Sequence, residues 1–288
     1  MTEKETRRRH ELTQKARTVV VKVGTSVLTG ERLEIDLGRM GDLTREICDL
    51  KNSGRQVILV TSGAIGAGLG KLGLKERPED LRLRQASAAV GQSILMHYYE
   101  ILFDNYKQVV AQLLLTKEDF SDPERFQNLR NTLRTLLKLD VIPIVNENDV
   151  VSIHELKDLA KPNVSTRITF GDNDTLAALI ASRFGADLLI ILSDVDGLYD
   201  QAPTKRRHPN VISIVAEVTS SIERLAKGEG AMGRGGMLTK IQAARVVAES
   251  GGATVIANGR AEGVIGRIMK GEDVGTIFLP RERGRRGG

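Results

Sequence analysis

The chain has 288 residues, of which 41% are hydrophobic and 3% aromatic, with a single cysteine and no tryptophan. This composition is typical of a globular protein of one large domain or two, and one cysteine excludes an internal disulfide. The formal charge of +5 lies at the ends, since residues 1–17 and 281–288 each carry +3 and the body between them carries −1. We therefore interpret 1–16 and 281–288 as basic solubilising tails. A nucleic-acid surface is disfavoured, because stacking aromatic residues are too few.

The sequence also argues against a membrane protein. No apolar run approaches the ~20 residues that span a bilayer, and the charged N-terminus lacks the apolar core of a signal peptide. We expect a cytoplasmic protein in which Cys48 packs inside a helix.

Buried strands and amphipathic helices alternate along the chain. The β-branched run over 18–23 predicts a strand, helical spacing over 35–53 predicts a helix that ends at Gly54, and 57–61 again resembles a strand. Asp122 and Pro123 are typical of a helix N-cap and first turn. The same patterns predict helices over about 81–103, 123–138, 173–184, 219–227 and 236–250, and strands over 109–115, 141–145, 188–192, near 212, 254–257 and 276–279.

This alternation predicts an α/β fold, a three-layer αβα sandwich with a mainly parallel central sheet. Residues 150–170 are less regular, with a loop over 157–163 and half of a hairpin over 164–170. We place one domain at 17–280, between the two tails.

Lys22 lies at the carboxyl end of the first strand, inside an apolar run. Burial of a lysine is costly unless an anion meets it, and ligands of open α/β sheets bind at the carboxyl ends of the strands. Lys22 therefore either extends out of the strand end to solvent or faces a bound anion. Gly24, Thr25 and Ser26 favour the anion, because they offer close backbone approach and hydroxyl groups.

The run Gly68–Gly73 matches the dinucleotide fingerprint G-x-G-x-x-G, but its context is wrong. It starts seven residues after the strand instead of in the first turn, and no acidic residue lies between Leu83 and Tyr99, where a ribose-binding acid is expected. We reject this match. Small residues in the helix that follows indicate close packing against a neighbour.

Glycine-rich strand ends, two lysines and several Asn/Asp clusters suggest phosphoryl transfer, in which a protein mainly positions reactants and neutralises charge. The four histidines lie in tail, loop or helix contexts that favour structural roles, and no Walker A pattern is present. A nucleotide would then be held by Gly235 and Gly236 at a helix start and by Lys240 one turn in.

Two Asn/Asp clusters remain open in role. Asn146, Asp149, Asn173 and Asp174 can be metal ligands, helix caps, or partners of a polar small molecule, and Asp172 is suited to be a helix N-cap. The first cluster follows a buried strand, where a site of an α/β sheet belongs.

Five motifs in order resemble the amino-acid kinase family, and within it the members that phosphorylate glutamate. The resemblance runs from about Arg17 to Leu279, and it rests on Val21–Ser26, Thr61–Ile65, Asn146–Asp149, Gly171–Asp174 and Gly235–Lys240, with Gln85–Gln92 and Val264–Gly266 in support. It implies the amino-acid kinase fold, with an acceptor-binding half over about 17–185 and a nucleotide-binding half over about 186–280. It also implies ATP-dependent phosphorylation of the γ-carboxylate of L-glutamate, the first step of proline biosynthesis, with Mg²⁺.

The same resemblance implies residue roles by position. Lys22 and Lys240 would stabilise the transferring phosphoryl group, and Asp174 would hold them in place. Glutamate would be bound by Ser62, Gly63, Asn146, Asp149 and Asn173. ATP would be bound by Lys22, Gly24, Thr25, Ser193, Asp194 and the loop and helix start Arg234, Gly235, Gly236, Met237, Leu238, Thr239 and Lys240. No residue is assigned as a dedicated metal ligand.

Further expectations concern regulation and partners. The resemblance implies a homo-oligomer, feedback inhibition by proline, a downstream glutamyl-phosphate reductase, and a chain without the C-terminal PUA domain of longer members. The long 150–170 segment, Thr169 and Arg234 depart from the family pattern and leave the strength of glutamate binding and of proline inhibition open. The alternatives are a family member with another acceptor and a catalytically silent nucleotide sensor.

Overall fold

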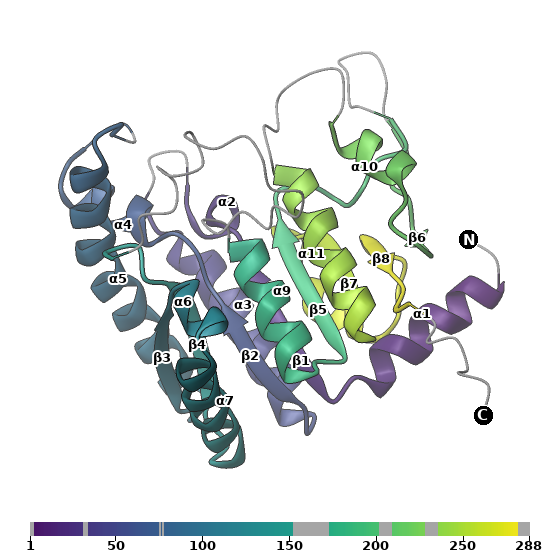
Figure 1. The fold of residues 1–288 in the computed structure, drawn as a ribbon, viewed down its shortest axis with the longest axis horizontal. Coiled ribbons are helices and arrows are strands. Elements are labelled where there is room, and N and C mark those ends of the chain that lie inside the picture. The colour runs from purple at the N-terminus through teal and green to yellow at the C-terminus, as the bar shows by residue number, and fades with distance from the viewer. Residues whose placement is uncertain are drawn as a thin grey trace.

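A computed structural model of the chain describes residues 3–30, 34–74, 76, 78–151, 173–201, 209–227 and 236–281. Eight strands form one sheet with helices on both faces (Figure 1). The predicted three-layer αβα sandwich with a mainly parallel sheet is thereby confirmed.

The sheet has the order β3-β4-β2-β1-β5-β7-β8-β6. All neighbouring strands are parallel except β7 and β8, which are antiparallel. The strands are β1 (Thr18–Val23), β2 (Gln56–Val60), β3 (Val110–Leu115), β4 (Ile142–Glu147), β5 (Leu188–Ser193), β6 (Ile214–Val215), β7 (Ala253–Asn258) and β8 (Thr276–Phe278).

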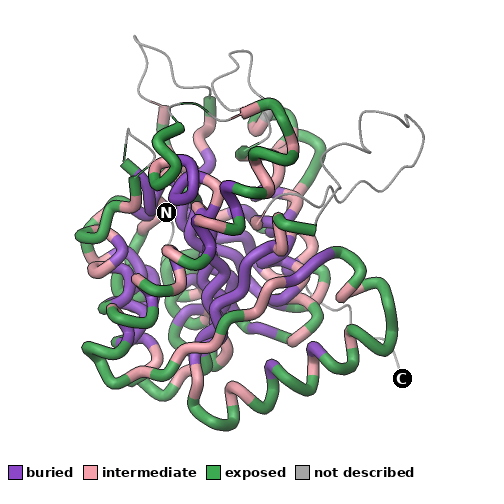
Figure 2. The backbone as a smooth tube through the Cα atoms, turned by 90° about the vertical axis from the view of Figure 1, so that its left-hand side faces the viewer, coloured by how far each residue is buried: buried purple, intermediate pink, exposed green. Residues whose placement is uncertain are grey.

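Two apolar cores lie on opposite faces of the sheet, because side chains alternate along each strand. In β1, Val19 and Val21 belong to one core and Val20 to the other. The first core is covered by α3 (Leu37–Asn52), α5 (Leu81–Asp104) and α12 (Val264–Met269), and the second by α7 (Pro123–Lys138), α9 (Asn173–Phe184) and α11 (Gly236–Ser250). Figure 2 shows the buried backbone gathered in the middle of the molecule.

The remaining described helices are short or lie outside these layers. They are α1 (Glu3–Lys15), α2 (Thr25–Leu28), α4 (Ala64–Lys71), α6 (Glu118–Ser121) and α10 (Ser220–Lys227). The predicted start of α7 is confirmed, since the Asp122 side chain accepts a hydrogen bond from the Arg125 backbone N–H and Pro123 opens the helix.

The N-terminal segment differs from the flexible tail that the sequence suggested. It forms α1, and Arg9 in its middle is fully buried. The Arg9 guanidinium donates to Asp273 at 3.1 Å and to the Ser213 carbonyl at 3.2 Å, so long-range contacts fix the helix. Helices α2, α4, α6 and α12 were also not predicted, and β4 extends through Asn146 and Glu147, which we expected just beyond the strand.

The rejected glycine motif has a packing role instead. A Cβ added to Gly68 of α4 would lie 1.8 Å from the Ser87 carbonyl oxygen, and one added to Gly91 of α5 would lie 1.7 Å from the Ala64 carbonyl oxygen. The backbones of α4 and α5 therefore touch where they cross. The close packing expected of α5 is confirmed.

Several predictions fall on residues outside the described ranges: the loop and hairpin over 157–170, Asp172 as an N-cap, Thr169, Arg234 and Gly235. In the described part of the chain, no helix combines the length and apolarity needed to cross a membrane. Cys48 is buried in α3, as expected.

Candidate active site

The centre of the sheet is where the chain reverses its direction of strand addition. From β1 the chain adds β2, β4 and β3 on one side, and β5 and β7 on the other. In open α/β sheets, ligands bind outside the carboxyl ends of the strands at such a switch point. Lys22 is the last residue but one of β1, and Ser193 is the last residue of β5. The Gly24 backbone N–H donates to the Leu192 carbonyl at 3.0 Å, which joins the two strand ends.

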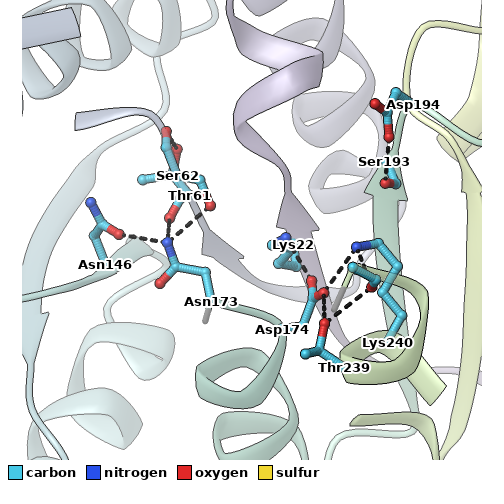
Figure 3. A network of polar contacts seen from close by, with 11 residues as sticks. Lys22, Thr61, Ser62, Asn146, Asn173, Asp174, Ser193, Asp194, Thr239 and Lys240 are labelled. Carbon is cyan, nitrogen blue, oxygen red and sulfur yellow. Dashed lines mark hydrogen bonds and ion pairs between the residues drawn. The ribbon is translucent and has the colours of Figure 1, made fainter. Parts of the chain in front are cut away.

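Asp174 lies between two lysines at this edge (Figure 3). Its carboxylate is 1% exposed, with one oxygen 2.6 Å from Lys22 Nζ and the other 3.0 Å from Lys240 Nζ. Thr239 Oγ1 donates to the same carboxylate at 3.1 Å, and Lys240 Nζ also donates to the Gly236 carbonyl at 3.0 Å. The strand β1, the first turn of α9 and the first turns of α11 thus meet at one carboxylate.

The electrostatics of this cluster follow from its composition. Burial acts to raise the pKa of the Asp174 carboxyl, but Lys22 and Lys240 outweigh burial, so the pKa lies below its ordinary value. One carboxylate and two ammonium groups leave a net charge of +1 in a buried place. Such a place attracts an anion, because burial of a cation is unfavourable without a counter-charge. Lys22 does not extend to solvent, since its side chain is only 6% exposed.

A second polar cluster lies beside the first, on the side toward β2 and β4 (Figure 3). Asn173 Nδ2 is within hydrogen-bond distance of the Thr61 carbonyl at 2.9 Å, Ser62 Oγ at 2.9 Å and Asn146 Oδ1 at 3.0 Å. Since Asn173 and Asp174 are adjacent at the start of α9, one helix terminus links this amide cluster to the lysine pair.

The other residues named from the sequence lie at the same edge, with less contact between them. Gly63 is the N-cap of α4 with a φ of 100°, which favours glycine, and Asp149 is half-buried two residues beyond β4. Ser193 Oγ donates to the exposed Asp194 at 3.1 Å. Gly24 is buried between the strand ends, Thr25 is exposed at the start of α2, and the first turn of α11 contributes Gly236, Met237 and Leu238.

Within the described ranges, no three His, Cys, Asp or Glu side chains gather closely enough to hold a metal ion. A magnesium ion that is carried by nucleotide phosphates needs only one or two protein carboxylates. The exposed Asp194 at the end of β5 suits that mode of binding.

Two residues of α5 next to the amide cluster were missed by the sequence reasoning. Gln92 accepts a hydrogen bond from Asn146 at 2.8 Å, and Tyr99 contacts Thr61 through their hydroxyl groups at 2.9 Å. A signal existed, because Gln92 and Tyr99 are seven residues apart and so share one face of α5. A polar residue at a buried helical position is informative.

Comparisons with known proteins identify the family of this chain. A profile described as "Amino acid kinase family" matches residues 17–258. The chain is 51% identical over 263 residues to "Glutamate 5-kinase" of Caldanaerobacter subterraneus subsp. tengcongensis, which covers 91% of this chain and 68% of the relative. It is 50% identical to "Glutamate 5-kinase" of Moorella thermoacetica, over 93% of this chain and 68% of the relative.

A further relative, "Glutamate 5-kinase" of Clostridium acetobutylicum, is 47% identical over 92% of this chain and 95% of the relative. Among solved structures, "Carbamate kinase from Giardia lamblia bound to AMP-PNP" shares the fold with a TM-score of 0.62 and 19% identity, over 92% of this chain and 99% of that one. Since the profile spans most of the chain and the relatives are close to half identical, this chain belongs to the amino acid kinase family.

Proposed function

We propose that this protein transfers the γ-phosphoryl group of ATP to the γ-carboxylate of L-glutamate, which yields ADP and L-glutamyl 5-phosphate, the first step of proline biosynthesis. The observation that carries the proposal is the buried Lys22–Asp174–Lys240 cluster at the centre of the sheet edge. The sequence identity to three relatives named glutamate 5-kinase supports the acceptor.

The reaction needs charge neutralisation more than proton transfer. A glutamate side chain has a pKa near ~4.3 and is already ionised at neutral pH, so its oxygen attacks the γ-phosphorus without a general base. The new P–O bond forms as the bond to the β-phosphate oxygen breaks, and ADP leaves with the electron pair. The absence of a histidine from the described cluster fits this chemistry.

In this proposal the two ammonium groups of Lys22 and Lys240 contact the transferring phosphoryl group, whose negative charge spreads over its oxygens in the transition state. Asp174 holds both groups in place through its two oxygens. Magnesium bound to ATP supplies further neutralisation of phosphate charge, and Asp194 is the described residue best suited to approach it.

Glutamate is assigned to the amide cluster and its neighbours, with Ser62, Gly63, Asn146, Asp149 and Asn173 as the proposed contacts. ATP is assigned to the β5 end and the start of α11, with Gly24, Thr25, Ser193, Asp194, Arg234, Gly235 and the first turn of α11. The acceptor-binding half over 17–185 and the nucleotide-binding half over 186–280 meet at Asp174 and Lys240 in this division. Feedback by proline, assembly of identical chains, a downstream glutamyl-phosphate reductase and a cytoplasmic location stay predictions.

A hydroxylamine trap tests the reaction. The protein is incubated with Mg²⁺-ATP, hydroxylamine and one acceptor from a panel, and the hydroxamate that forms only from an acyl phosphate is measured. We expect a signal with L-glutamate and none with aspartate or N-acetylglutamate. The Lys240→Ala variant should remain folded and lose most of the signal. ADP formation that depends on an acceptor without any hydroxamate would show a different acceptor group and would refute the proposal.

A further inference from the structure

We propose that Gln92 is a positioning residue for glutamate: it holds the Asn146 amide, and through it the Asn173 amide, in the orientation that binds the acceptor. This inference rests on the proposed function and deepens it, because it assigns a role to a residue of α5 that contacts the amide cluster. The carrying observation is an uninterrupted series of three amides that runs from α5 through β4 to the start of α9.

A hydrogen bond joins each amide of the series to the next. Gln92 is 8% exposed, and its Oε1 accepts from Asn146 Nδ2 at 2.8 Å. Asn146 is 2% exposed, and its Oδ1 accepts from the Glu147 backbone N–H at 2.9 Å and from Asn173 Nδ2 at 3.0 Å. Asn173 Nδ2 is also 2.9 Å from the Thr61 carbonyl oxygen.

Backbone groups determine the direction of every amide in this series. A backbone N–H can only donate, so the Glu147 N–H requires the oxygen of Asn146 on its side and turns Asn146 Nδ2 toward Gln92. A backbone carbonyl can only accept, so the Thr61 carbonyl requires the nitrogen of Asn173. Both requirements give the same contact, in which Asn173 Nδ2 donates to Asn146 Oδ1. Since Asn146 Nδ2 then faces Gln92, the Gln92 side chain can only accept from it.

Packing alone does not account for a glutamine here. Gln92 Nε2 is buried and has no hydrogen-bond partner in the described structure, although burial of an unpaired amide N–H is unfavourable. A methionine of similar volume would fill the space without that cost. The acceptor atom that Gln92 offers to Asn146 is therefore what the residue contributes.

The crossing of α4 and α5 brings Gln92 to this place. Gly91, its neighbour in sequence, packs against the Ala64 carbonyl so closely that no side chain fits. Ala64 is the first residue of α4 and follows Ser62 by two residues, so this contact fixes the position of Gln92 relative to the amide cluster. On the same face of α5, Tyr99 contacts Thr61, but through the Thr61 hydroxyl and outside the amide series. Tyr99 is thus a matched control.

The test compares three variants by their KM for glutamate and for ATP in the hydroxamate assay and by glutamate binding in calorimetry. Gln92→Met leaves the Asn146 donor unpaired, and we expect KM and Kd for glutamate to rise about ten- to hundredfold, with KM for ATP changed less than about threefold. Gln92→Glu keeps an oxygen that can accept from Asn146, and we expect it to recover most of the glutamate affinity. Tyr99→Phe should lower the melting temperature without a change in KM for glutamate.

A double variant asks whether Gln92 acts through Asn146. In an Asn146→Ala background, Gln92→Met should raise the KM for glutamate less than about twofold further, because the residue it orients is already gone. The inference would be overturned if the effects of Asn146→Ala and Gln92→Met on the KM for glutamate multiply in the double variant. It would also be overturned if Gln92→Glu binds glutamate no better than Gln92→Met, or if Gln92→Met raises the KM for glutamate and the KM for ATP equally. Failure of the wild type to bind and phosphorylate glutamate would refute the proposed function itself, whereas an active wild type with unaffected variants would refute only the role of Gln92.

Discussion

Neutralisation of Asp174 is the perturbation that bears most directly on the buried cluster. Asp174→Asn keeps the size of the side chain but removes the charge shared by Lys22 at 2.6 Å and Lys240 at 3.0 Å. Loss of one partner of a buried ion pair costs about 3–5 kcal/mol, because the remaining charge has no counter-charge. We expect the free energy of unfolding to fall by about 3–5 kcal/mol, a large part of the ~5–15 kcal/mol of a typical domain.

The measurement is urea unfolding at neutral pH, without nucleotide and then with Mg²⁺-ATP. Asp187→Asn is the control, since Asp187 lies exposed before the opposite end of β5 and accepts backbone N–H groups of Arg17 and Thr18 at 2.8 and 2.9 Å. The free energy of unfolding of Asp187→Asn should fall by less than about 1 kcal/mol, as is usual for substitutions at exposed sites. Mg²⁺-ATP should restore part of the stability of Asp174→Asn, because phosphate can replace the missing anion.

The pH dependence has a definite sign. The pKa of Asp174 in the folded protein is lowered: burial opposes this, but the two lysines prevail. A carboxyl with a lowered folded pKa contributes stability that is complete above its unfolded pKa of ~3.9 and is lost as the pH falls through the folded value. The difference between wild type and Asp174→Asn should therefore be constant from neutral pH to about 5 and shrink below about 4. A neutral-pH difference under about 1 kcal/mol would refute the account of the cluster.

Two further predictions concern the scaffold. Gly91→Ala places a Cβ 1.7 Å from the Ala64 carbonyl oxygen, so α4 and α5 must separate, and the free energy of unfolding in urea should fall by about 2–3 kcal/mol. In the control Gly266→Ala the new Cβ has nothing within 4 Å, and the free energy of unfolding should rise by about 0.5–1 kcal/mol. Equal stability of the two variants would contradict the packing argument. Burial, together with the neighbouring Asp49, raises the pKa of the Cys48 thiol to about 12, so a thiol reagent at pH 8 should label the protein only after unfolding, and rapid labelling of the native protein would show that α3 opens readily.

Strands and capped helices were predictable because their determinants are local. The β-branched run at 18–23, the continuous apolar run at 188–192 and the Asp122–Pro123 start of α7 require no knowledge of distant residues. The helix α4 was missed since its glycines disfavour a helix locally, and contact with α5 outweighs that preference. The helix α1 was missed because its fixing contacts, from Arg9 to Ser213 and Asp273, are more than 200 residues away in sequence.

In the candidate site, too, local features were predictable from the sequence and long-range contacts were not. The position of Lys22 at a strand end left solvent and an anion as alternatives, and the residues behind it favoured an anion. The resemblance to the family pointed to Asp174 as a partner of Lys22, and the structure shows the contact between them at 2.6 Å. The series from Gln92 to Asn146 to Asn173 joins residues that are 54 and 27 positions apart, and no periodic pattern reports such a contact. Only the sheet order and the α4–α5 crossing bring these residues together.

The central claim is that a carboxylate oxygen of glutamate attacks the γ-phosphorus of ATP at this cluster. L-glutamate labelled with ¹⁸O in both γ-carboxylate oxygens, Mg²⁺-ATP and hydroxylamine are incubated with the protein, and the phosphate released is analysed by mass spectrometry. Because hydroxylamine attacks the acyl carbon, the bridging oxygen leaves with phosphorus, and the account predicts one ¹⁸O atom in each phosphate. Unlabelled phosphate would mean that water or another group accepts the phosphoryl group, and would contradict it.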